Sequence, residues 1–213
     1  MNCVSVRARF ERFPATVKGA FIIRGEDRDP HQVILREARV VAVGGGFRSI
    51  PMASVTLDVA PKQDVFVPFE LQVSDFAPGW YGLECDLEVD GVSDTHEGGK
   101  RFSVAWPRAT VRRGLVRVRR EVQLGEEARV RIDQVDCAGD SIKIGLVVTP
   151  PEPLSVSLSA DGTRIEVLDV EFDEASGRIR VVAYPLFRAH EVLRMELRGR
   201  SRRAEGKLDI HLP

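Results

Sequence analysis

Carboxylates and imidazoles gather in two polar segments in the N-terminal half of the chain. The segments "GEDRDPH" (25–31) and "GVSDTHEGG" (91–99) hold the candidate ligands Asp27, Asp29, His31, Asp94, His96 and Glu97. Carboxylate oxygens and imidazole nitrogens are groups that divalent cations accept. Their spacing matches no recognised metal motif, however, and Asp, Gly and Pro also satisfy turn geometry without a ligand. Two interpretations therefore stay open: a metal- or ligand-binding surface, or ordinary polar loops.

The sequence carries none of the common catalytic motifs that we looked for. It has no nucleophile elbow, phosphate-binding loop or metalloprotease helix, and the Gly-rich "VGGGF" is not followed by a helical pattern. Three cysteines, Cys3, Cys85 and Cys137, are scattered without CxxC spacing, which indicates neither a disulfide framework nor a zinc knuckle. We therefore expect a non-enzymatic protein with no cofactor.

A stripe of acids follows one face of a predicted strand. The acids occupy every second position, so successive carboxylates are about 7 Å apart along the strand. They are Glu84, Asp86, Glu88 and Asp90. They can dock a basic partner, or they can pair across the sheet with Arg36 or Arg39 on one side and Lys100 or Arg101 on the other. Because exposed ion pairs of this kind are common, we expect the second arrangement.

The bulk composition narrows the class of partner. The chain has 213 residues, 43% of them hydrophobic and 30% charged, with a formal net charge of -1. A net charge so close to zero gives no strong electrostatic potential that would attract nucleic acid or a charged membrane surface. The Arg-rich region 108–120 is followed by acids and has no nearby aromatic side chains for base stacking, which argues against nucleic-acid binding. No apolar run is long enough to span a bilayer, and the first residues lack the apolar run of a secretory signal. We expect a cytoplasmic protein whose partner is another protein.

Apolar and polar residues alternate with a period of two along almost the whole chain, which predicts an all-β protein. Seven candidate strands precede the "WPRATVRRG" segment and further strands follow it. Seven short strands in roughly 100 residues are typical of an immunoglobulin-like sandwich. The sequence thus predicts two tandem immunoglobulin-like β-sandwich domains, at 1–106 and 115–213, joined by a linker at 107–114.

The stretch "SDFAPGWYGLECDLEVDG" (74–91) alternates strictly from Tyr81 to Val89. It resembles the sixth strand of immunoglobulin-like domains, where a Tyr near the strand start bonds its hydroxyl back to the preceding corner. "APGWY" is also similar to the entry of that strand in bacterial immunoglobulin-like and macroglobulin-like sandwiches, and the resemblance covers mainly residues 74–106. The second candidate strand has no Cys and the third has no Trp, so we expect Cys85 to be a small buried hydrophobe. An arrestin-like pair of sandwiches is the alternative architecture.

The strand order predicts which loops share an end of the first sandwich. One end gathers apolar loop residues near the join, and we expect an interdomain contact there made by Phe13, Phe47, Phe76, Trp80 and Trp106. The opposite end gathers the loops at 25–31, 60–64 and 91–99. The resulting functional expectation is a protein-binding or scaffolding module, and the alternative is a ligand- or divalent-metal-binding module that uses these loops.

Overall fold

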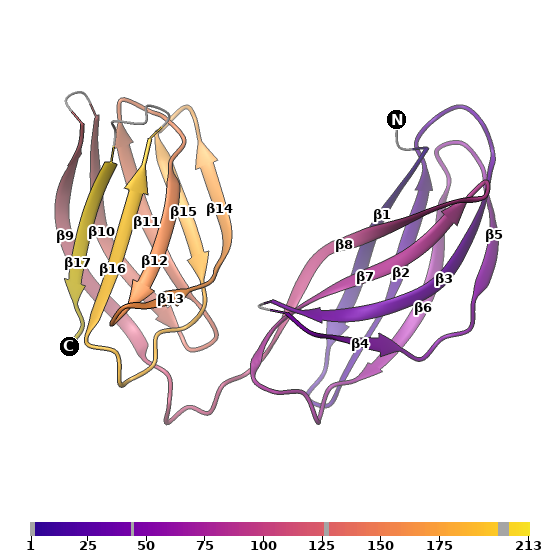
Figure 1. Ribbon diagram of the computed structural model, residues 1–213, viewed down its shortest axis with the longest axis horizontal. Coiled ribbons are helices and arrows are strands. Elements are labelled where there is room, and N and C mark those ends of the chain that lie inside the picture. The colour runs from indigo at the N-terminus through magenta and orange to yellow at the C-terminus, as the bar shows by residue number, and fades with distance from the viewer. Residues whose placement is uncertain (1–2, 44, 126–127, 200–204) are drawn as a thin grey trace. The chain divides into compact units, whose positions relative to one another are not determined.

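The computed structural model describes residues 3–43, 45–125, 128–199 and 205–213, which form antiparallel strands and no helix (Figure 1). The chain divides into two compact units, Met1–Val104 and Ala105–Pro213. The prediction of an all-β protein with tandem β-sandwiches is confirmed. Within the described residues, no helix is long and apolar enough to cross a membrane.

The first unit is built from two sheets, with the strand orders β1-β2-β6 and β4-β3-β7-β8. Its strands are β1 (Val4–Arg12), β2 (Thr16–Gly25), β3 (His31–Ala42), β4 (Phe47–Ile50), β5 (Val55–Val59), β6 (Asp64–Gln72), β7 (Gly79–Val89) and β8 (Val92–Val104). β5 and β4 pair with successive parts of β3 and together act as one interrupted edge strand. With these two counted as the fourth strand, the first, second and fifth strands face the third, fourth, sixth and seventh, an immunoglobulin-like arrangement of seven strands.

Strand β7 has the two faces that its alternation predicts. Leu83, Cys85 and Leu87 are buried in the core, while the acids between them are on the outer face. The Tyr81 hydroxyl donates a hydrogen bond of 2.8 Å to the carbonyl oxygen of Ala77 at the preceding corner, as the resemblance to the sixth immunoglobulin strand implies. The sequence therefore located both this strand and the anchor at its start.

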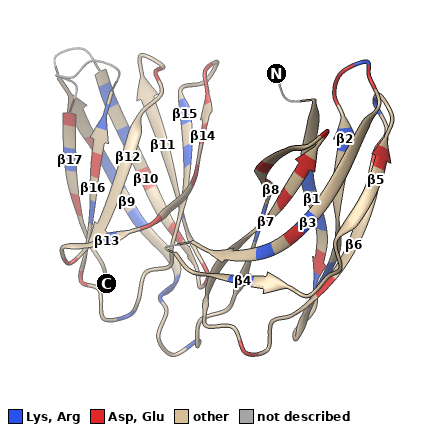
Figure 2. Cartoon of the chain, turned by 45° about the vertical axis from the view of Figure 1, so that its right-hand side comes forward, with Lys and Arg blue, Asp and Glu red and all other residues tan. Residues whose placement is uncertain are grey.

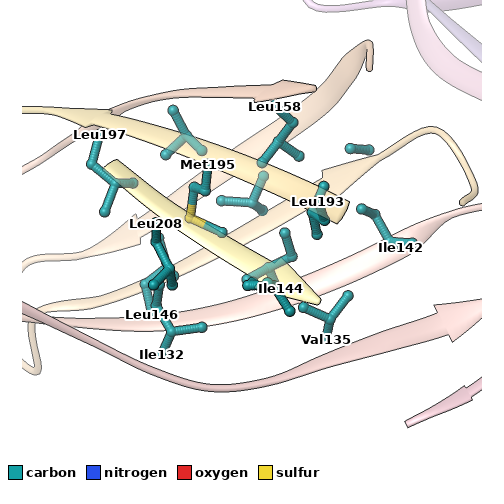
Figure 3. Packing of buried hydrophobic residues seen from close by; sticks show 14 of the residues in the cluster. Ile132, Val135, Ile142, Ile144, Leu146, Leu158, Leu193, Met195, Leu197 and Leu208 are labelled. Carbon is teal, nitrogen blue, oxygen red and sulfur yellow. The ribbon is translucent and has the colours of Figure 1, made fainter. Parts of the chain in front are cut away.

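The second unit reaches a sandwich by a different strand order, β14-β15-β11-β10-β9 facing β13-β12-β16-β17. Its strands are β9 (Arg113–Leu124), β10 (Ala128–Ala138), β11 (Ile142–Thr149), β12 (Ser155–Ala160), β13 (Thr163–Ile165), β14 (Val167–Asp173), β15 (Arg178–Ala183), β16 (Val192–Arg198) and β17 (Glu205–His211). Met195 lies in the middle of its core, between side chains of both sheets such as Leu158 and Ile144 (Figure 3). Each unit has a core of its own.

Two predicted segments differ in the structure. The sequence pattern predicts a loop at 91–99, but β8 begins at Val92 directly after a two-residue turn. Asp90 and Gly91 form this turn with φ of 47° and 86°, the left-handed backbone that Asp-Gly favours in tight hairpins. In the predicted linker, Val111 is fully buried and bridges to Phe187, and β9 starts at Arg113. The residues from 111 onward are thus part of the fold of the second unit.

Candidate functional site

The predicted loops at 25–31 and 60–64 meet at one end of the first unit, together with the turn at 90–91 that stands where the loop 91–99 was predicted. The amide of Lys62 donates to the carbonyl of Gly25 at 3.0 Å, and the amide of Asp90 donates to the carbonyl of Gln32 at 3.0 Å. His31 is the first residue of β3 and lies between these loops. This end therefore places an imidazole among loop carboxylates.

The His31 imidazole is held between two carboxylates. Its Nδ1 lies 2.6 Å from Asp90 Oδ2 and its Nε2 lies 2.7 Å from Asp27 Oδ1. Only 7% of the side chain is exposed. Since a carboxylate can only accept, both ring nitrogens donate in this arrangement, and the ring is the protonated imidazolium.

The three groups stabilise one another's charged forms. Hydrogen bonding to Asp90 and then to Asp27 raises the pKa of His31 above its ordinary value. The same contacts, made by His31, lower the pKa of Asp27 and of Asp90. A buried cation flanked by two anions follows from this geometry.

The structure brings together only part of the predicted ligand set. The backbone amide of Asp29 donates a hydrogen bond of 3.3 Å to Asp27 Oδ1, so Asp29 stabilises the local turn and its carboxylate is not part of the cluster contact. His96 lies on β8, where its Nε2 is 3.8 Å from Asp94 Oδ2. His96 pairs across the sheet with Cys85 on β7, and Cys85 pairs in turn with Ala38 on β3. This register puts His96 roughly 20 Å along the sheet from His31, at about 3.3 Å per residue.

Glu97 also lies on β8, in register with Glu84. Asp94, His96 and Glu97 therefore do not join Asp27 and His31. The reason is the hairpin: because the chain turns at Asp90 and Gly91, the residues after the turn lead away from this end of the sandwich.

Cys3 joins the cluster, although nothing in the sequence pattern singled it out. Val4 pairs with Gly25, so the residue before β1 lies beside the residues that follow β2, and the amide of Glu26 donates to the carbonyl of Cys3 at 2.8 Å. One ligand atom each from Cys3, Asp27 and His31 lies within 4.8 Å of the other two. The pairing of β1 with β2 was the only signal that could have located this contact.

The acidic stripe on β7 is paired within the chain. Arg39 contacts Glu84 at 3.0 Å and Asp86 at 2.9 Å. Arg36 contacts Glu88, and Asp90 binds His31. Figure 2 colours the Lys and Arg residues of the chain blue and the Asp and Glu residues red. The predicted cross-strand pairing with Arg36 and Arg39 is confirmed, so the stripe is not an open acidic surface.

The opposite end of the first unit carries a surface that we call the Phe47 patch, made of Arg39, Phe47, Arg48, Asp75 and Phe76. Phe47 is 71% exposed and lies 6.0 Å from the Arg39 guanidinium. Arg48 lies 4.7 Å above the Phe76 ring and pairs with Asp75 at 2.8 Å. A cavity of about 230 Å³ is lined by Phe47, Arg48, Asp75, Phe76 and Tyr81, among others.

The aromatic residues assigned to an interdomain contact fall in both units. Phe13, which is 43% exposed, lies in the turn between β1 and β2, and the amide of Val43 donates to the carbonyl of Trp80 at 2.9 Å. Phe13 and Trp80 therefore lie at the end of the first unit that carries the Phe47 patch. Trp106 packs edge-on against Tyr184 within the second unit, with ring centroids 5.6 Å apart. The contact between the units stays a prediction, which a small-angle scattering profile would test.

The second unit has an open groove of about 720 Å³ on the outer face of β10, β11, β15 and β14. Gly145 lies at its floor, paired with Gln134 on one side and Arg180 on the other. A Cβ at Gly145 would meet no atom within 4 Å. A glycine inside a strand weakens it, and such a position often allows another backbone or a ligand to approach closely.

The two buried cysteines are unsuited to nucleophilic chemistry. Burial raises the pKa of the Cys85 thiol to about 12 and also raises the pKa of Cys137. A thiol acts as a nucleophile only as its thiolate. At neutral pH both side chains are therefore small core hydrophobes, as expected for Cys85.

Several solved structures are similar to this chain. No protein-family model matches the chain, and no curated protein matches it. Among solved structures, a conserved domain protein from Bacillus anthracis is similar at a TM-score of 0.34 and 11% identity, over 100% of this chain and 88% of that one. A marsupial T cell receptor is similar at a TM-score of 0.27 and 12% identity, over 100% of this chain and 63% of that one. At these scores the likenesses carry no argument about function.

Proposed function

We propose that this protein is a non-enzymatic binding module that docks another protein through the Phe47 patch. The observation that carries the proposal is the exposure of Phe47, an aromatic ring that is 71% accessible and lies 6.0 Å from the Arg39 guanidinium. Phe47 and the partly buried Phe76 line the same cavity, and apolar side chains gathered in one place often mark interaction sites. Aromatic residues and arginine are also the types enriched at the energetic centres of protein interfaces.

The surroundings of Phe47 favour a pre-formed surface. Phe47 pairs across β4 and β3 with Val41, which in turn pairs with Gly82 on β7. A Cβ at Gly82 would meet no atom within 4 Å, so the floor beside the ring is open. The 230 Å³ cavity on the other side is suited to accept one apolar side chain of a partner.

Replacing Phe47 by alanine is expected to weaken partner binding by at least about tenfold and to leave folding unchanged. The full chain, immobilised, would be used to capture proteins from lysate of the source organism, and the dissociation constant of each captured protein would be measured by calorimetry. Because Phe47 is exposed, thermal unfolding of the variant should match that of the wild type.

Phe66→Ala is the matched control, since Phe66 is also an exposed Phe of the first unit, at 57%. It lies on β6 of the other sheet, away from the Phe47 patch. A captured protein that binds wild type and Phe66→Ala equally and Phe47→Ala weakly supports the proposal. If every captured protein bound all three chains with equal affinity, the Phe47 patch would have no role in binding.

A second surface on the other unit would make the module a scaffold. The groove above Gly145 is lined by charges of both signs, including Arg131, Asp133 and Lys143, which suit an extended polar segment of a partner. We expect Gly145→Trp to obstruct the floor of this groove and to abolish binding of any protein docked there, while Gly145→Ala, which adds one methyl group, retains it. Calorimetry with both variants and an unfolding control provides the check, and equal affinities would remove the groove from the proposal.

A further inference from the structure

We propose that Cys3, Asp27 and His31 form a binding site for a divalent transition-metal ion of the zinc type. The three residues come from the start of β1, the loop after β2 and the start of β3, at the end of the sandwich opposite the Phe47 patch. The inference goes beyond the proposed protein-binding function and does not depend on it.

Backbone bonds hold Cys3 and His31 in place, and Asp27 lies in the short loop between β2 and β3. The pairing of Val4 with Gly25, continued by the bond from the Glu26 amide to the Cys3 carbonyl, holds Cys3 beside Asp27. His31 opens β3 and pairs with Val59 on β5. Ligands that are held by a rigid scaffold need little reordering when an ion binds.

The ligand atoms are close enough for one ion to bridge them. The selected atoms of Cys3, Asp27 and His31 lie within 4.8 Å of one another. In a tetrahedral zinc site, with bonds of roughly 2.0–2.3 Å, neighbouring ligand atoms are about 3.5 Å apart. A side-chain adjustment on the order of 1 Å therefore completes the site. The proton that now lies between His31 Nε2 and Asp27 leaves as the ion takes its place, and the Cys3 thiol gives up its proton.

Asp90 provides the orienting contact that metal-bound histidines require. It accepts from His31 Nδ1 at 2.6 Å, so Nε2 is turned toward Asp27 and Cys3. Asp90 is itself held, because its Oδ1 accepts from the amide of Gln32 at 3.0 Å. A carboxylate on the far nitrogen of a liganding histidine fixes the ring and increases its basicity.

The donor set selects the class of ion. One sulfur, one nitrogen and one oxygen suit borderline ions such as Zn²⁺ and Co²⁺, whereas Ca²⁺ and Mg²⁺ require oxygen ligands only. Three protein ligands leave a fourth position for water or for an atom of a bound molecule. The His31 side chain is almost fully buried, which shields the ion from bulk water on one side.

The test uses the full chain, without an affinity tag, titrated with Co²⁺ and then with Zn²⁺. We expect wild type to bind one ion, with a thiolate-to-cobalt absorption band in the near ultraviolet that Zn²⁺ displaces. Cys3→Ser should lose that band and weaken Zn²⁺ binding at least about tenfold, and His31→Gln should weaken it further. Asp90→Asn, which keeps an oxygen acceptor and tolerates the left-handed turn, should weaken it by about 10–100-fold.

Two controls keep the outcome decisive. His96→Gln should bind metal as wild type does, because His96 lies on β8 away from the site, and Phe47→Ala should also bind normally. If His31→Gln fails to fold, the partly exposed Cys3 still provides the comparison. The proposal is overturned if wild type gives no cobalt–thiolate band, or if Cys3→Ser binds Zn²⁺ as tightly as wild type and the His96→Gln control do.

Discussion

Phe21→Ala is expected to lower the free energy of unfolding of the first unit by about 3–5 kcal/mol. Phe21 is fully buried on β2, and its ring lies 5.1 Å from that of Phe69 on β6. Truncation removes the buried ring and leaves a cavity that neighbouring strands fill only in part. Urea unfolding, with hydrogen exchange followed by mass spectrometry, measures the loss and locates it.

The control is Phe66→Ala on the same sheet. Phe66 pairs with Ile22, the residue next to Phe21, but is 57% exposed, so its loss should change the stability by no more than about 0.5 kcal/mol. Because the second unit has a separate core, peptides from β11 and β16 should keep their protection in Phe21→Ala. Equal destabilisation by both substitutions would contradict the assignment of Phe21 to the core.

Gly98→Val should destabilise the first unit by about 1–3 kcal/mol, the usual cost of overpacking. Gly98 is buried on β8, where this strand approaches β1 of the other sheet. A Cβ there would lie 2.9 Å from the Ala8 Cβ and 3.1 Å from the Leu83 carbonyl oxygen. A larger side chain must therefore push the two sheets apart along this edge.

Gly82→Val provides the comparison on the neighbouring strand β7. A Cβ at Gly82 meets nothing within 4 Å and its backbone is not in the left-handed region, so the stability should change by no more than about 0.5 kcal/mol. Thermal and urea unfolding of both variants would distinguish the two glycines. A stable Gly98→Val chain would show that β8 can move away from β1 at little cost.

The two candidate sites of the first unit lie at opposite ends of β3. His31 is its first residue, and Val41, which pairs with Phe47, is its second-last. This length of strand separates them by roughly 33 Å. Substitutions at one end should therefore leave the other unaffected, and metal binding and protein binding can be tested separately.

The sequence by itself determined the strands and their faces. The alternation from Tyr81 to Val89 specified which side chains are buried, because successive residues of a strand point to opposite faces. The resemblance to the sixth immunoglobulin strand implied the Tyr81 anchor, and the alternation placed the acids of β7 where Arg39 can pair with them. These features depend on the local pattern of residues and on the pairing of adjacent strands, and both can be inferred from a single sequence.

Only the tertiary structure decided which loop residues meet. Residues 91–99 have the pattern of a loop because β8 is exposed from Val92 to Thr95, so the strand shows no alternation there. The hairpin at Asp90 and Gly91 then carried His96 away from His31 and left Asp90 beside it. Cys3, far from Asp27 along the chain, reached the cluster through the register of β1 with β2. Register between distant strands is set by the packing of the whole sheet, so the spacing of residues along the chain could not specify this site.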